Sequence, residues 1–245
     1  MKMTLPLAAL AAALALSGCQ KAEEEAFGQR VRAYLLEHPE VLQEAVARLQ
    51  EKEQLKAQTA SREALGRFRA QLERDPRDFV VNPGGSITVV EFFDYNCGYC
   101  KLAAPEVLKL VEENPDVRLV FKEFAFQTPN SIEAAKIALT PIAKPKALAL
   151  HRGFMAQKPL DAAAIDRTLV AAGVDPAAAR AAAADPAIER QITDTHELAR
   201  ALGIDGTPAF VVGDRIINGA DMAGLRAAIA EAKSGALKRP SGKPT

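Results

Sequence analysis

Residues 91–100 read EFFDYNCGYC, and the fold of this 245-residue chain can be argued outward from them. With residues 87–90 before it, the segment up to Phe93 forms a run rich in β-branched and aromatic residues, which predicts a strand buried on both faces. Apolar spacing at 101–113 predicts a helix with Leu102, Leu108, Leu110 and Val111 available for burial, and residues 117–121 predict a second strand. Strand, helix and strand in this order indicate a βαβ unit with parallel strands.

The rest of the sheet is predicted on both sides of this unit. Residues 79–81 form a short extended piece between two clusters of turn-forming residues. Residues 209–212 and 215–217 predict two strands, and Gly213 with the following aspartate suits a hairpin turn between them. These short strands add to the βαβ unit and complete an α/β sheet.

Helices fill the remaining sequence of this domain. Residues 130–202 are rich in alanine and interrupted by prolines, which predicts an insertion of several short helices. A last amphipathic helix is predicted at 221–233. We therefore predict an α/β domain over residues 78–237, with a helical insertion at about 128–202 and a flexible tail at 238–245.

A helical extension is predicted ahead of this domain, over residues 20–77. Apolar residues at spacings of three, four and seven predict a helix at 27–37 and a longer one from Pro39 towards Leu72. The apolar stripe on the longer helix is narrow and its other faces are charged. Such a helix either associates with a second copy of the chain or lies across its own domain.

The first 19 residues have the features of an export signal. Lys2 precedes an apolar run at residues 5–16, which is too short to span a bilayer comfortably but suits a signal peptide. The run ends in Leu-Ser-Gly-Cys, which resembles the lipobox of bacterial lipoproteins and would place a lipid on Cys19. The alternative is ordinary cleavage after Ser17. Both place the mature protein outside the cytoplasm, where disulfides persist.

Charge and cysteine content narrow the class of protein. Lysine plus arginine and aspartate plus glutamate each number 31, so no net charge attracts nucleic acid, and no nucleic-acid partner is expected. There are three cysteines, and if Cys19 carries lipid, only Cys97 and Cys100 remain to pair. A disulfide that closes so small a loop adds little chain-entropy stability. This pair is better suited to being made and broken.

Cys97 lies at the predicted start of a helix, where free backbone N–H groups and the helix dipole stabilise a thiolate. Cys100, one turn further, can attack a mixed disulfide on Cys97 and release the substrate. A zinc site would need four ligands, and no second CxxC or close histidine pair is present. Capture of Cu(I) by the two soft thiolates is the remaining metal alternative.

Glu91 interrupts an otherwise apolar strand six residues before Cys97. If buried, it must be protonated or partnered, and it could then accept the proton of Cys100. The alternative is a position on an exposed rim. Lys122 and Glu123, after the second strand, either form a charge network with Glu91 or are a solvated pair.

The remaining candidates for catalysis and ligand binding have simpler interpretations. His38, His151 and His196 have no convergent partners in the sequence, so we expect surface or helix-capping roles. Gly84-Gly85 and Gly203 do not form a phosphate-binding loop, and no nucleotide or other cofactor is expected.

Residues 91–100, the helical insertion and Gly-Thr-Pro at 206–208 together resemble the DsbA-like branch of the thioredoxin superfamily. The resemblance covers roughly residues 78–233, and its ordered combination of motifs is more specific than CxxC alone. It implies a thioredoxin fold with an inserted helical subdomain. It also implies that Cys97 is the nucleophile and Cys100 the resolving cysteine.

The same resemblance assigns three further residues. Glu91 is implied to be the buried acid, and Pro208 the cis-proline beside the dithiol. Thr207 would offer its backbone to an extended substrate. These roles come from the resemblance and not from spacing.

Two positions depart from the strongly oxidising members of the branch. Those proteins have proline and histidine between the cysteines and valine before the cis-proline, where this chain has Gly98, Tyr99 and Thr207. The Thr-Pro pair is more similar to isomerase and reductase relatives. The extension at 31–42 is similar to that of the ScsC and Com1-like subgroup, where it can oligomerise the protein.

The sequence therefore predicts an exported or envelope-anchored thiol–disulfide oxidoreductase, nearer to an isomerase or reductase than to a strong oxidase. Its expected partners are unfolded or misoxidised envelope proteins, a membrane redox partner and, through the extension, further copies of the chain. The alternative is a copper-sequestering or scaffold protein that uses the same dithiol without turnover.

Overall fold

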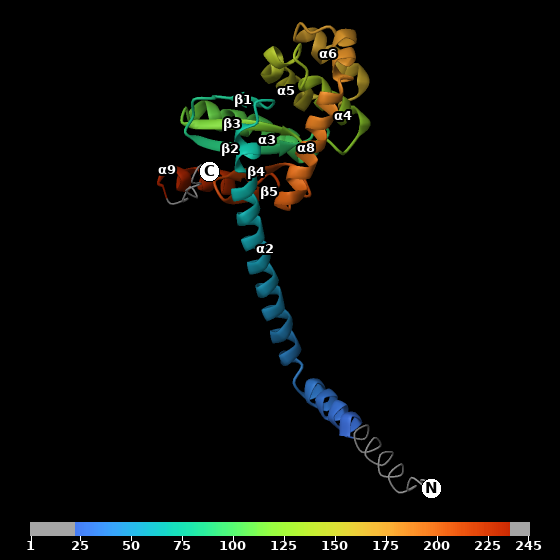
Figure 1. Ribbon diagram of the computed structural model, residues 1–245, viewed down its shortest axis with the longest axis vertical. Helices are drawn as coiled ribbons and strands as arrows, with labels where there is room; N and C mark the ends of the chain where they lie inside the picture. The colour runs from blue at the N-terminus through green and yellow to red at the C-terminus, as the bar shows by residue number, and fades with distance from the viewer. Residues whose placement is uncertain (1–22, 236–245) are drawn as a thin grey trace, which may run out of the picture. The chain divides into compact units, whose positions relative to one another are not determined.

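The computed structural model describes residues 23–235, which fall into two units (Figure 1). The first unit ends at Gln58 and the second begins at Thr59. The predictions made for the signal peptide, for a lipid on Cys19 and for the tail at 238–245 lie outside the described residues.

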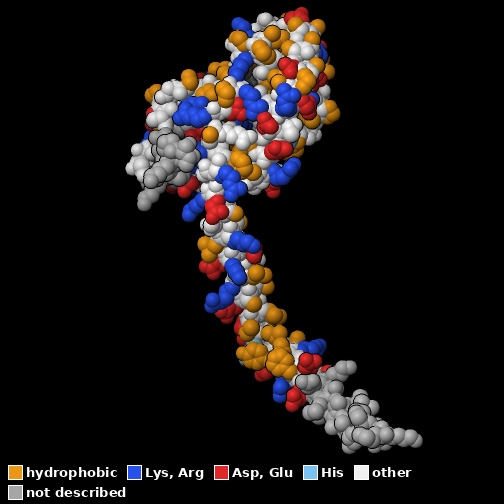
Figure 2. All heavy atoms as spheres, viewed as in Figure 1, with side chains coloured by type: hydrophobic (Ala, Val, Ile, Leu, Met, Phe, Trp, Pro, Cys, Tyr) orange, Lys and Arg blue, Asp and Glu red, His pale blue; other side chains and the backbone are white. Residues whose placement is uncertain are grey.

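The first unit is helical. Residues 23–37 form one helix, Pro39 lies in the turn that follows, and α2 (Glu40–Arg74) begins directly after it. Proline suits this place because it has no backbone N–H to donate inside a helix. Apolar side chains in this unit are exposed, as the orange atoms of Figure 2 show. The largest of them are Phe27, Val31, Tyr34, Leu36, Leu42, Val46, Leu49 and Leu55.

The second unit contains a five-stranded mixed sheet with the strand order β1-β3-β2-β4-β5. β2 and β3 pair in parallel, and the other neighbours pair antiparallel. The expected βαβ unit is therefore confirmed, as is the β4–β5 hairpin. The strands are β1 (Phe79–Val81), β2 (Ile87–Phe93), β3 (Val117–Glu123), β4 (Ala209–Val212) and β5 (Arg215–Asn218).

The helices of this unit begin at sequence signals that are local. Thr128, Asp175 and Asp185 cap three of them with side-chain oxygens, and each is followed by a proline in the first turn. In Figure 1 the inserted helices, in yellow to orange, lie together beside the sheet. The elements are α3 (Gly98–Glu113), α4 (Pro129–Ala138), η1 (Lys144–Lys146), α5 (Ala147–Ala156), α6 (Ala162–Ala171), α7 (Pro176–Ala183), α8 (Pro186–Leu202) and α9 (Met222–Lys233).

Two hydrophobic cores lie on opposite faces of the sheet, because side chains alternate along each strand. Val89 and Phe93 of β2 join a core with α3, α9 and the inserted helices, and this core contains both thiols. Val90 and Phe92 join a smaller core with Leu72 of α2 and with α8. β2 thus packs against helices on both faces, as its apolar run predicts.

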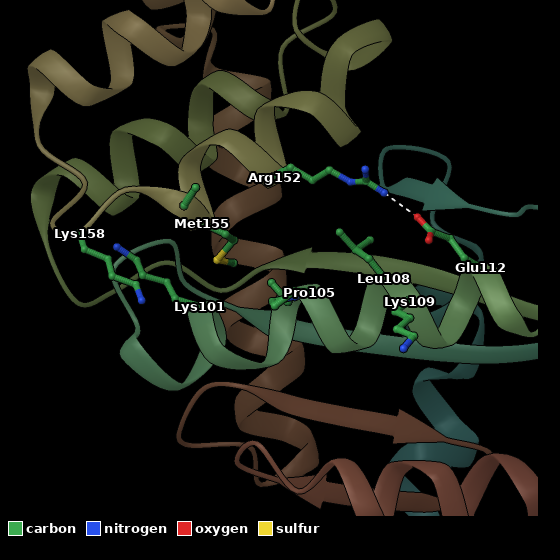
Figure 3. Close-up of a pocket in the computed structure, with 10 residues that line it drawn as sticks. Lys101, Pro105, Leu108, Lys109, Glu112, Arg152, Met155 and Lys158 are labelled. Atoms are coloured by element: carbon green, nitrogen blue, oxygen red, sulfur yellow. Dashed lines mark hydrogen bonds and ion pairs between the residues drawn. The ribbon is translucent and has the colours of Figure 1, made fainter.

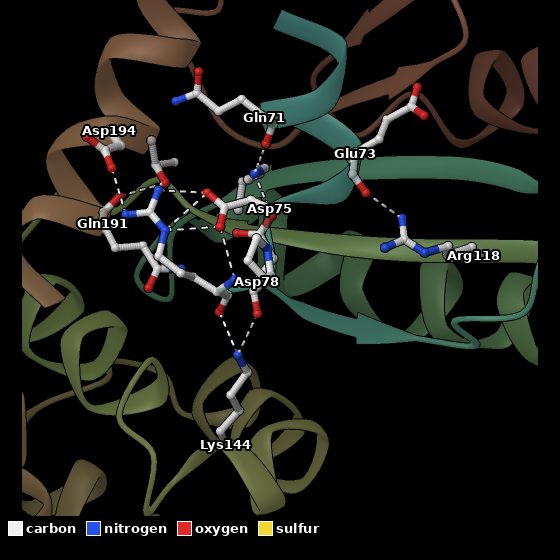
Figure 4. Close-up of polar contacts among 12 residues, drawn as sticks. Gln71, Glu73, Asp75, Asp78, Arg118, Lys144, Gln191 and Asp194 are labelled. Atoms are coloured by element: carbon white, nitrogen blue, oxygen red, sulfur yellow. Dashed lines mark hydrogen bonds and ion pairs between the residues drawn. The ribbon is translucent and has the colours of Figure 1, made fainter. Parts of the chain in front are cut away.

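Polar contacts fasten the end of α2 to the sheet within the second unit (Figure 4). Lys122 of β3 is almost completely buried, and its ammonium donates to the carboxylate of Asp78 and, at 2.7 Å, to the carbonyl of Gln71. Burial raises the pKa of Asp78 to about 6, although the charge of Lys122 opposes the rise. Arg77 bridges Asp75 and Asp194 of α8, both at 2.7 Å.

One expectation about α3 is wrong. Leu102 was expected to be available for burial with Leu108 and its neighbours, but its side chain is 61% exposed. The buried positions of α3 recur around Ala103, Val107 and Leu110, so Leu102 lies on the outer face of the first turn. A helical period identifies a buried face, but tertiary packing decides where that face ends.

Candidate functional site

Cys97 is the N-cap of α3. β2 ends at Phe93, and the turn closes where the Cys97 N–H donates to the carbonyl of Asp94 at 3.1 Å. The Cys97 sulfur accepts a hydrogen bond from the backbone N–H of Cys100 at 3.1 Å. The nucleophile therefore takes the place that Ser, Thr or Asp takes at an ordinary N-cap.

The two thiols differ sharply in acidity. The hydrogen bond with the Cys100 side chain is the largest cause that lowers the pKa of Cys97 to about 6; burial opposes it, and the backbone N–H groups of Cys100 and Tyr99 add to it. Burial, together with the Cys97 sulfur, raises the pKa of the Cys100 thiol far above its ordinary value. Both cysteines are free thiols in this structure. One is ready to ionise near neutral pH, and the other is held protonated.

A loop from the other end of the domain reaches the dithiol. The Thr207–Pro208 peptide bond is cis, and the Cys97 thiol donates to the Thr207 carbonyl at 3.2 Å. The Pro208 carbonyl accepts from the Gly219 N–H at 2.8 Å, which ties the loop to the end of β5. The cis bond expected at Pro208 is present, and Thr207 contacts the first cysteine directly.

Glu91 is completely buried in β2, and neither carboxyl oxygen has a hydrogen-bond partner among the described residues. The exposed-rim alternative is therefore wrong. Burial, and to a smaller extent the negative charge of Cys97, raises the pKa of Glu91 to about 8. Its side chain projects to the sheet face whose core contains both thiols, since it alternates with Val89 and Phe93. An unpartnered acid with this pKa can exchange a proton near neutral pH.

Lys122 and Glu123 were expected to form a charge network with Glu91 or a solvated pair, and the structure shows neither arrangement. Lys122 projects to the opposite face of the sheet from Glu91 and pairs with Asp78, because successive side chains of a strand alternate. Glu123 is buried on the same face as Glu91, where it accepts a hydrogen bond from the Tyr95 hydroxyl at 2.9 Å. Burial raises its pKa well above the ordinary value. The two residues are neither solvated nor partners of Glu91.

Asp94 is a residue of the site that the sequence reasoning missed. It is fully buried, and its carboxylate accepts from the N–H of Asn96 at 2.7 Å, from the N–H of Phe126 at 2.8 Å, and from the Ser131 hydroxyl at 2.9 Å. It joins the turn before Cys97 to the start of α4. An aspartate directly after a buried strand was the available signal, since such a residue often caps a turn.

The histidine expectations need one correction. His151 was expected on the surface or at a helix cap, yet it is 2% exposed in α5 and both ring nitrogens lack partners among the described residues. Its ring packs against Phe93 and Phe121 at centroid distances of 5.0 Å and 4.6 Å. Burial lowers its pKa to about 3, so it is a neutral aromatic member of the core. His196 contacts the Ala125 carbonyl at 3.1 Å, and His38 lies 3.1 Å from Glu40.

Within residues 23–235, no three His, Cys, Asp or Glu side chains are grouped so that they could hold a metal ion. The dithiol is the pair of soft ligands on which a copper site would have to depend.

Comparison with protein families assigns the domain. The model of the DSBA-like thioredoxin domain matches residues 88–230, which is more than half of the chain and includes both cysteines and the cis-proline loop. The chain belongs to the DsbA-like thioredoxin family. The fold class implied by the sequence is confirmed, and by family the chain is a thiol–disulfide oxidoreductase. Residues 23–55 match the N-terminal domain of the copper resistance protein ScsC.

Individual relatives agree with this assignment. A solved linker-deletion variant of ScsC from Proteus mirabilis is 28% identical, with a TM-score of 0.66, over 96% of this chain and 99% of that one. The thiol:disulfide interchange protein DsbA of Bordetella pertussis is 30% identical over 57% of this chain and 69% of its own length. A shorter match, to Thioredoxin-like 1-3 of Arabidopsis thaliana, is 42% identical and covers 18% of each protein. The likeness to ScsC thus includes the helical extension as well as the DsbA-like domain.

Proposed function

We propose that the chain exchanges disulfides with envelope proteins through the dithiol of Cys97 and Cys100. The observation that carries the proposal is the capping position of Cys97, where hydrogen bonds lower its pKa to about 6. A thiol with this pKa is about nine-tenths thiolate at pH 7. The thiolate is the form that attacks a disulfide.

The exchange begins at Cys97. Its thiolate attacks one sulfur of a substrate disulfide, forms a mixed disulfide with it, and releases the other substrate sulfur as a thiolate that takes a proton from solvent. The Thr207 carbonyl, 3.2 Å from the attacking sulfur, lies where an extended substrate backbone can bind it through an N–H. The substrate remains attached to Cys97 until a second thiol attacks.

Two routes resolve the mixed disulfide. Cys100 can lose its proton and attack the Cys97 sulfur, which releases a reduced substrate and leaves the disulfide between the two cysteines. Glu91 is the proton acceptor we assign, because it is unpartnered and its pKa of about 8 lies in the working range. Alternatively, a second thiol of the substrate attacks, the substrate leaves with a rearranged disulfide, and the Cys97 thiolate is restored.

Gly98, Tyr99 and Thr207 favour the isomerase and reductase direction, since the strongly oxidising members carry other residues at these positions. An enzyme that works in this direction needs a membrane redox partner to keep the dithiol reduced. Equilibration with glutathione would measure its reduction potential and settle the direction. We expect a value nearer to reducing dithiols than to strong oxidants.

The proposal is tested by Cys97→Ser, with Cys100→Ser as the matched control. Cys97→Ser should lose insulin reduction and the refolding of scrambled substrates, by about 1,000-fold or more, because serine does not form the thiolate. Cys100→Ser keeps the attacking thiolate and should accumulate mixed disulfides that mass spectrometry detects. If Cys97→Ser retains both activities, the enzyme proposal fails.

Copper sequestration is the second candidate. It is favoured by two free thiols one helical turn apart, and by the name of the family model that matches residues 23–55. Burial of Cys100 argues against it, since a metal would need both sulfurs. Stoichiometric Cu(I) uptake by protein that does not exchange thiols would favour copper binding.

We further propose that the extension at 20–77 oligomerises the chain. The support is the set of exposed apolar side chains in the first unit, including Tyr34, Leu42 and Leu49. Their contact with water is unfavourable, and association would bury them. Light scattering of the full chain and of a chain that begins at Thr59 would test it. A larger mass for the full chain alone is expected, and a monomer in both samples would end the idea.

The location we propose is the periplasm or cell envelope. The support is the apolar run at residues 5–16, followed by the lipobox-like segment that ends in Cys19. Among the described residues, no helix is long and apolar enough to cross a bilayer. Mass spectrometry of the mature N-terminus would distinguish a lipid on Cys19 from cleavage after Ser17.

A further inference from the structure

A groove runs between α3 and α5, and Lys101, the residue after Cys100, lies at one end of it (Figure 3). Its cavity has a volume of about 490 Å³, within the range of sites that bind ligands. α3 contributes Lys101, Pro105 and Leu108 at helical spacing, and α5 contributes Arg152 and Met155. In Figure 3 the apolar side chains lie between Lys101 at one end and Arg152 at the other. The groove is therefore apolar along its length and charged at its ends.

The charges on this groove do not balance. Its lining includes four basic residues and one acidic residue, Glu112, which pairs with Arg152 across the groove at 2.7 Å. Lys109 pairs with Glu113 at 3.7 Å. Lys101 and Lys158 have no carboxylate partner in the part of the chain that the structure describes. These two neighbouring cations thus have no salt-bridge partner among the described residues, although the more distant negative charges of Asp94 and Cys97 also act on Lys101.

Lys101 is held in place by neutral groups. Its ammonium donates to the carbonyl of Gln157 and, at 3.5 Å, to the side-chain oxygen of Asn96. Burial lowers the pKa of Lys101; the charge of Lys158 adds to this, and the negative charges of Asp94 and Cys97 oppose it. An anion placed here would gain from both lysines at once and would relieve their repulsion.

A second hollow of about 600 Å³ shares these two lysines and is also lined by Asn96 and Gly98, the neighbours of Cys97 in sequence. Its wall includes Tyr99 and Leu102, which are 68% and 61% exposed although both are large and apolar. They follow Cys97 by two and five residues. The hollow and the groove therefore form one path that leads from the neighbours of Cys97, past the two lysines, to Leu108.

We propose that this path binds the segment flanking the reactive cysteine of a substrate and selects segments that combine acidic and apolar residues. The proposal rests on the proposed function, because the occupant is the protein whose disulfide Cys97 attacks. The path is open at its apolar wall and basic at its centre, so an apolar and acidic polypeptide complements it along its length. A purely apolar occupant would leave the two lysines uncompensated.

Helix geometry gives the spacing of the selected residues. α3 rises about 1.5 Å per residue, so Lys101 lies about 6 Å along the axis from Cys97, and Leu108 about 16 Å. An extended peptide advances about 3.3 Å per residue. The selected acidic residue therefore lies about two residues from the substrate cysteine, and an apolar residue about five residues away.

The test uses the reduced full-length chain and two peptides, each with one cysteine in a disulfide with cysteamine. The peptides differ only two residues from the cysteine, where one has aspartate and the other asparagine. The chain reduces each peptide, releases cysteamine and is oxidised to its Cys97–Cys100 disulfide. We expect the aspartate peptide to react about 3- to 10-fold faster at low salt, from one or two exposed ion pairs. The preference should shrink at high salt.

Lys158→Glu is the decisive variant, because Lys158 is exposed and reversing its charge should not unfold the domain. This variant should reduce the ratio of the aspartate-peptide rate to the asparagine-peptide rate to one, or invert it. The matched control Lys146→Glu, which is exposed and lies outside both hollows, should keep the ratio of the unmodified chain.

Equal rates for the two peptides with the unmodified chain would overturn the groove proposal while leaving the proposed function intact. If the chain reacts with neither peptide and does not reduce insulin, the proposed function itself is contradicted. Binding to phosphatidylglycerol vesicles that Lys158→Glu abolishes, without any peptide preference, would assign the groove to an anionic lipid and overturn the proposal.

Discussion

α2 (Glu40–Arg74) passes through two environments and shows how differently the two units use the same residue types. In the first unit Leu49 is 59% exposed, whereas Leu72 in the second unit is completely buried. A buried ion pair distinguishes the second unit: Asp78 and Lys122 pair in its core, whereas Glu44 and Arg48 of the first unit pair on an exposed helix face, as Arg152 and Glu112 do in the second. The described part of the first unit presents its large apolar groups outward, and the second unit encloses a charged pair.

This difference has a functional meaning. Exposed apolar side chains are a free-energy cost that a partner surface can remove, so the first unit is suited to association. Buried ionisable groups cost free energy unless they are paired or neutral. Those in the second unit are therefore candidates for a role in catalysis. Matched substitutions, one at a buried position and one at an exposed position, test this comparison.

The largest effect is expected at Glu91, which has no buried counterpart among residues 23–58 of the first unit. Its pKa is about 8 in the fold and about 4.5 ordinarily, so its contribution to stability is complete below pH 4.5 and lost as the pH rises through 8. At about 1.4 kcal/mol per pH unit, this amounts to about 5 kcal/mol. Denaturant unfolding at pH 4 and pH 9 should show Glu91→Gln gaining that much relative to the wild type. The control Glu51→Gln, on the exposed helix, should follow the wild-type profile.

The next effect is expected at the buried ion pair. Asp78→Asn leaves the Lys122 ammonium buried without a counter-charge, which should lower the free energy of unfolding at pH 7 by about 3–5 kcal/mol. Glu44→Gln, which breaks the exposed pair with Arg48, should change it by less than about 0.5 kcal/mol. Urea unfolding measures both. Equal losses would show that the two environments do not differ as described.

The two leucines of α2 give a matched pair. Leu72→Ala should destabilise the second unit by about 2–5 kcal/mol, because it leaves a cavity in the smaller core. Leu49→Ala should leave the unfolding of that unit unchanged and instead reduce the oligomer seen by light scattering. A Leu49→Ala protein that keeps its mass would weaken the association proposal.

The smallest effect concerns the dithiol itself. Cys100→Ala removes the hydrogen bond that is the largest cause of the low pKa of Cys97, so that pKa should rise from about 6 by about one unit, or about 1.4 kcal/mol. Thiolate absorbance at 240 nm, followed against pH, reports the titration. An unchanged midpoint would assign the acidity to the backbone N–H groups of the helix start.

Much of the fold could be predicted because its signals are local. Periodicity placed the strands from Phe79 to Asn218, and alanine content with interrupting prolines indicated the inserted helices. The motif at 91–100 located the dithiol at a strand-to-helix junction. Each of these depends on residues within a turn or two of one another.

The arrangement of the site could be predicted less well. Thr207 lies 110 residues from Cys97 in sequence, and its place at the dithiol was implied by resemblance and not by spacing. The sheet register, which no local pattern encodes, put Lys122 on the face opposite Glu91. Asp94 and His151 were missed or misjudged for the same reason, since their surroundings come from distant segments.

The amino-acid sequence by itself determined where the strands lie, that residues 130–202 are helical, which cysteine lies at a helix start, and that one acid interrupts an apolar strand. Only the tertiary structure decided that the cis-proline loop contacts the nucleophile and that, within residues 23–235, this acid has no hydrogen-bond partner and the two lysines beside the groove have no salt bridge. The physical reason is that hydrogen bonds and periodicity act over a few residues, whereas burial and electrostatic environment depend on every segment that packs nearby.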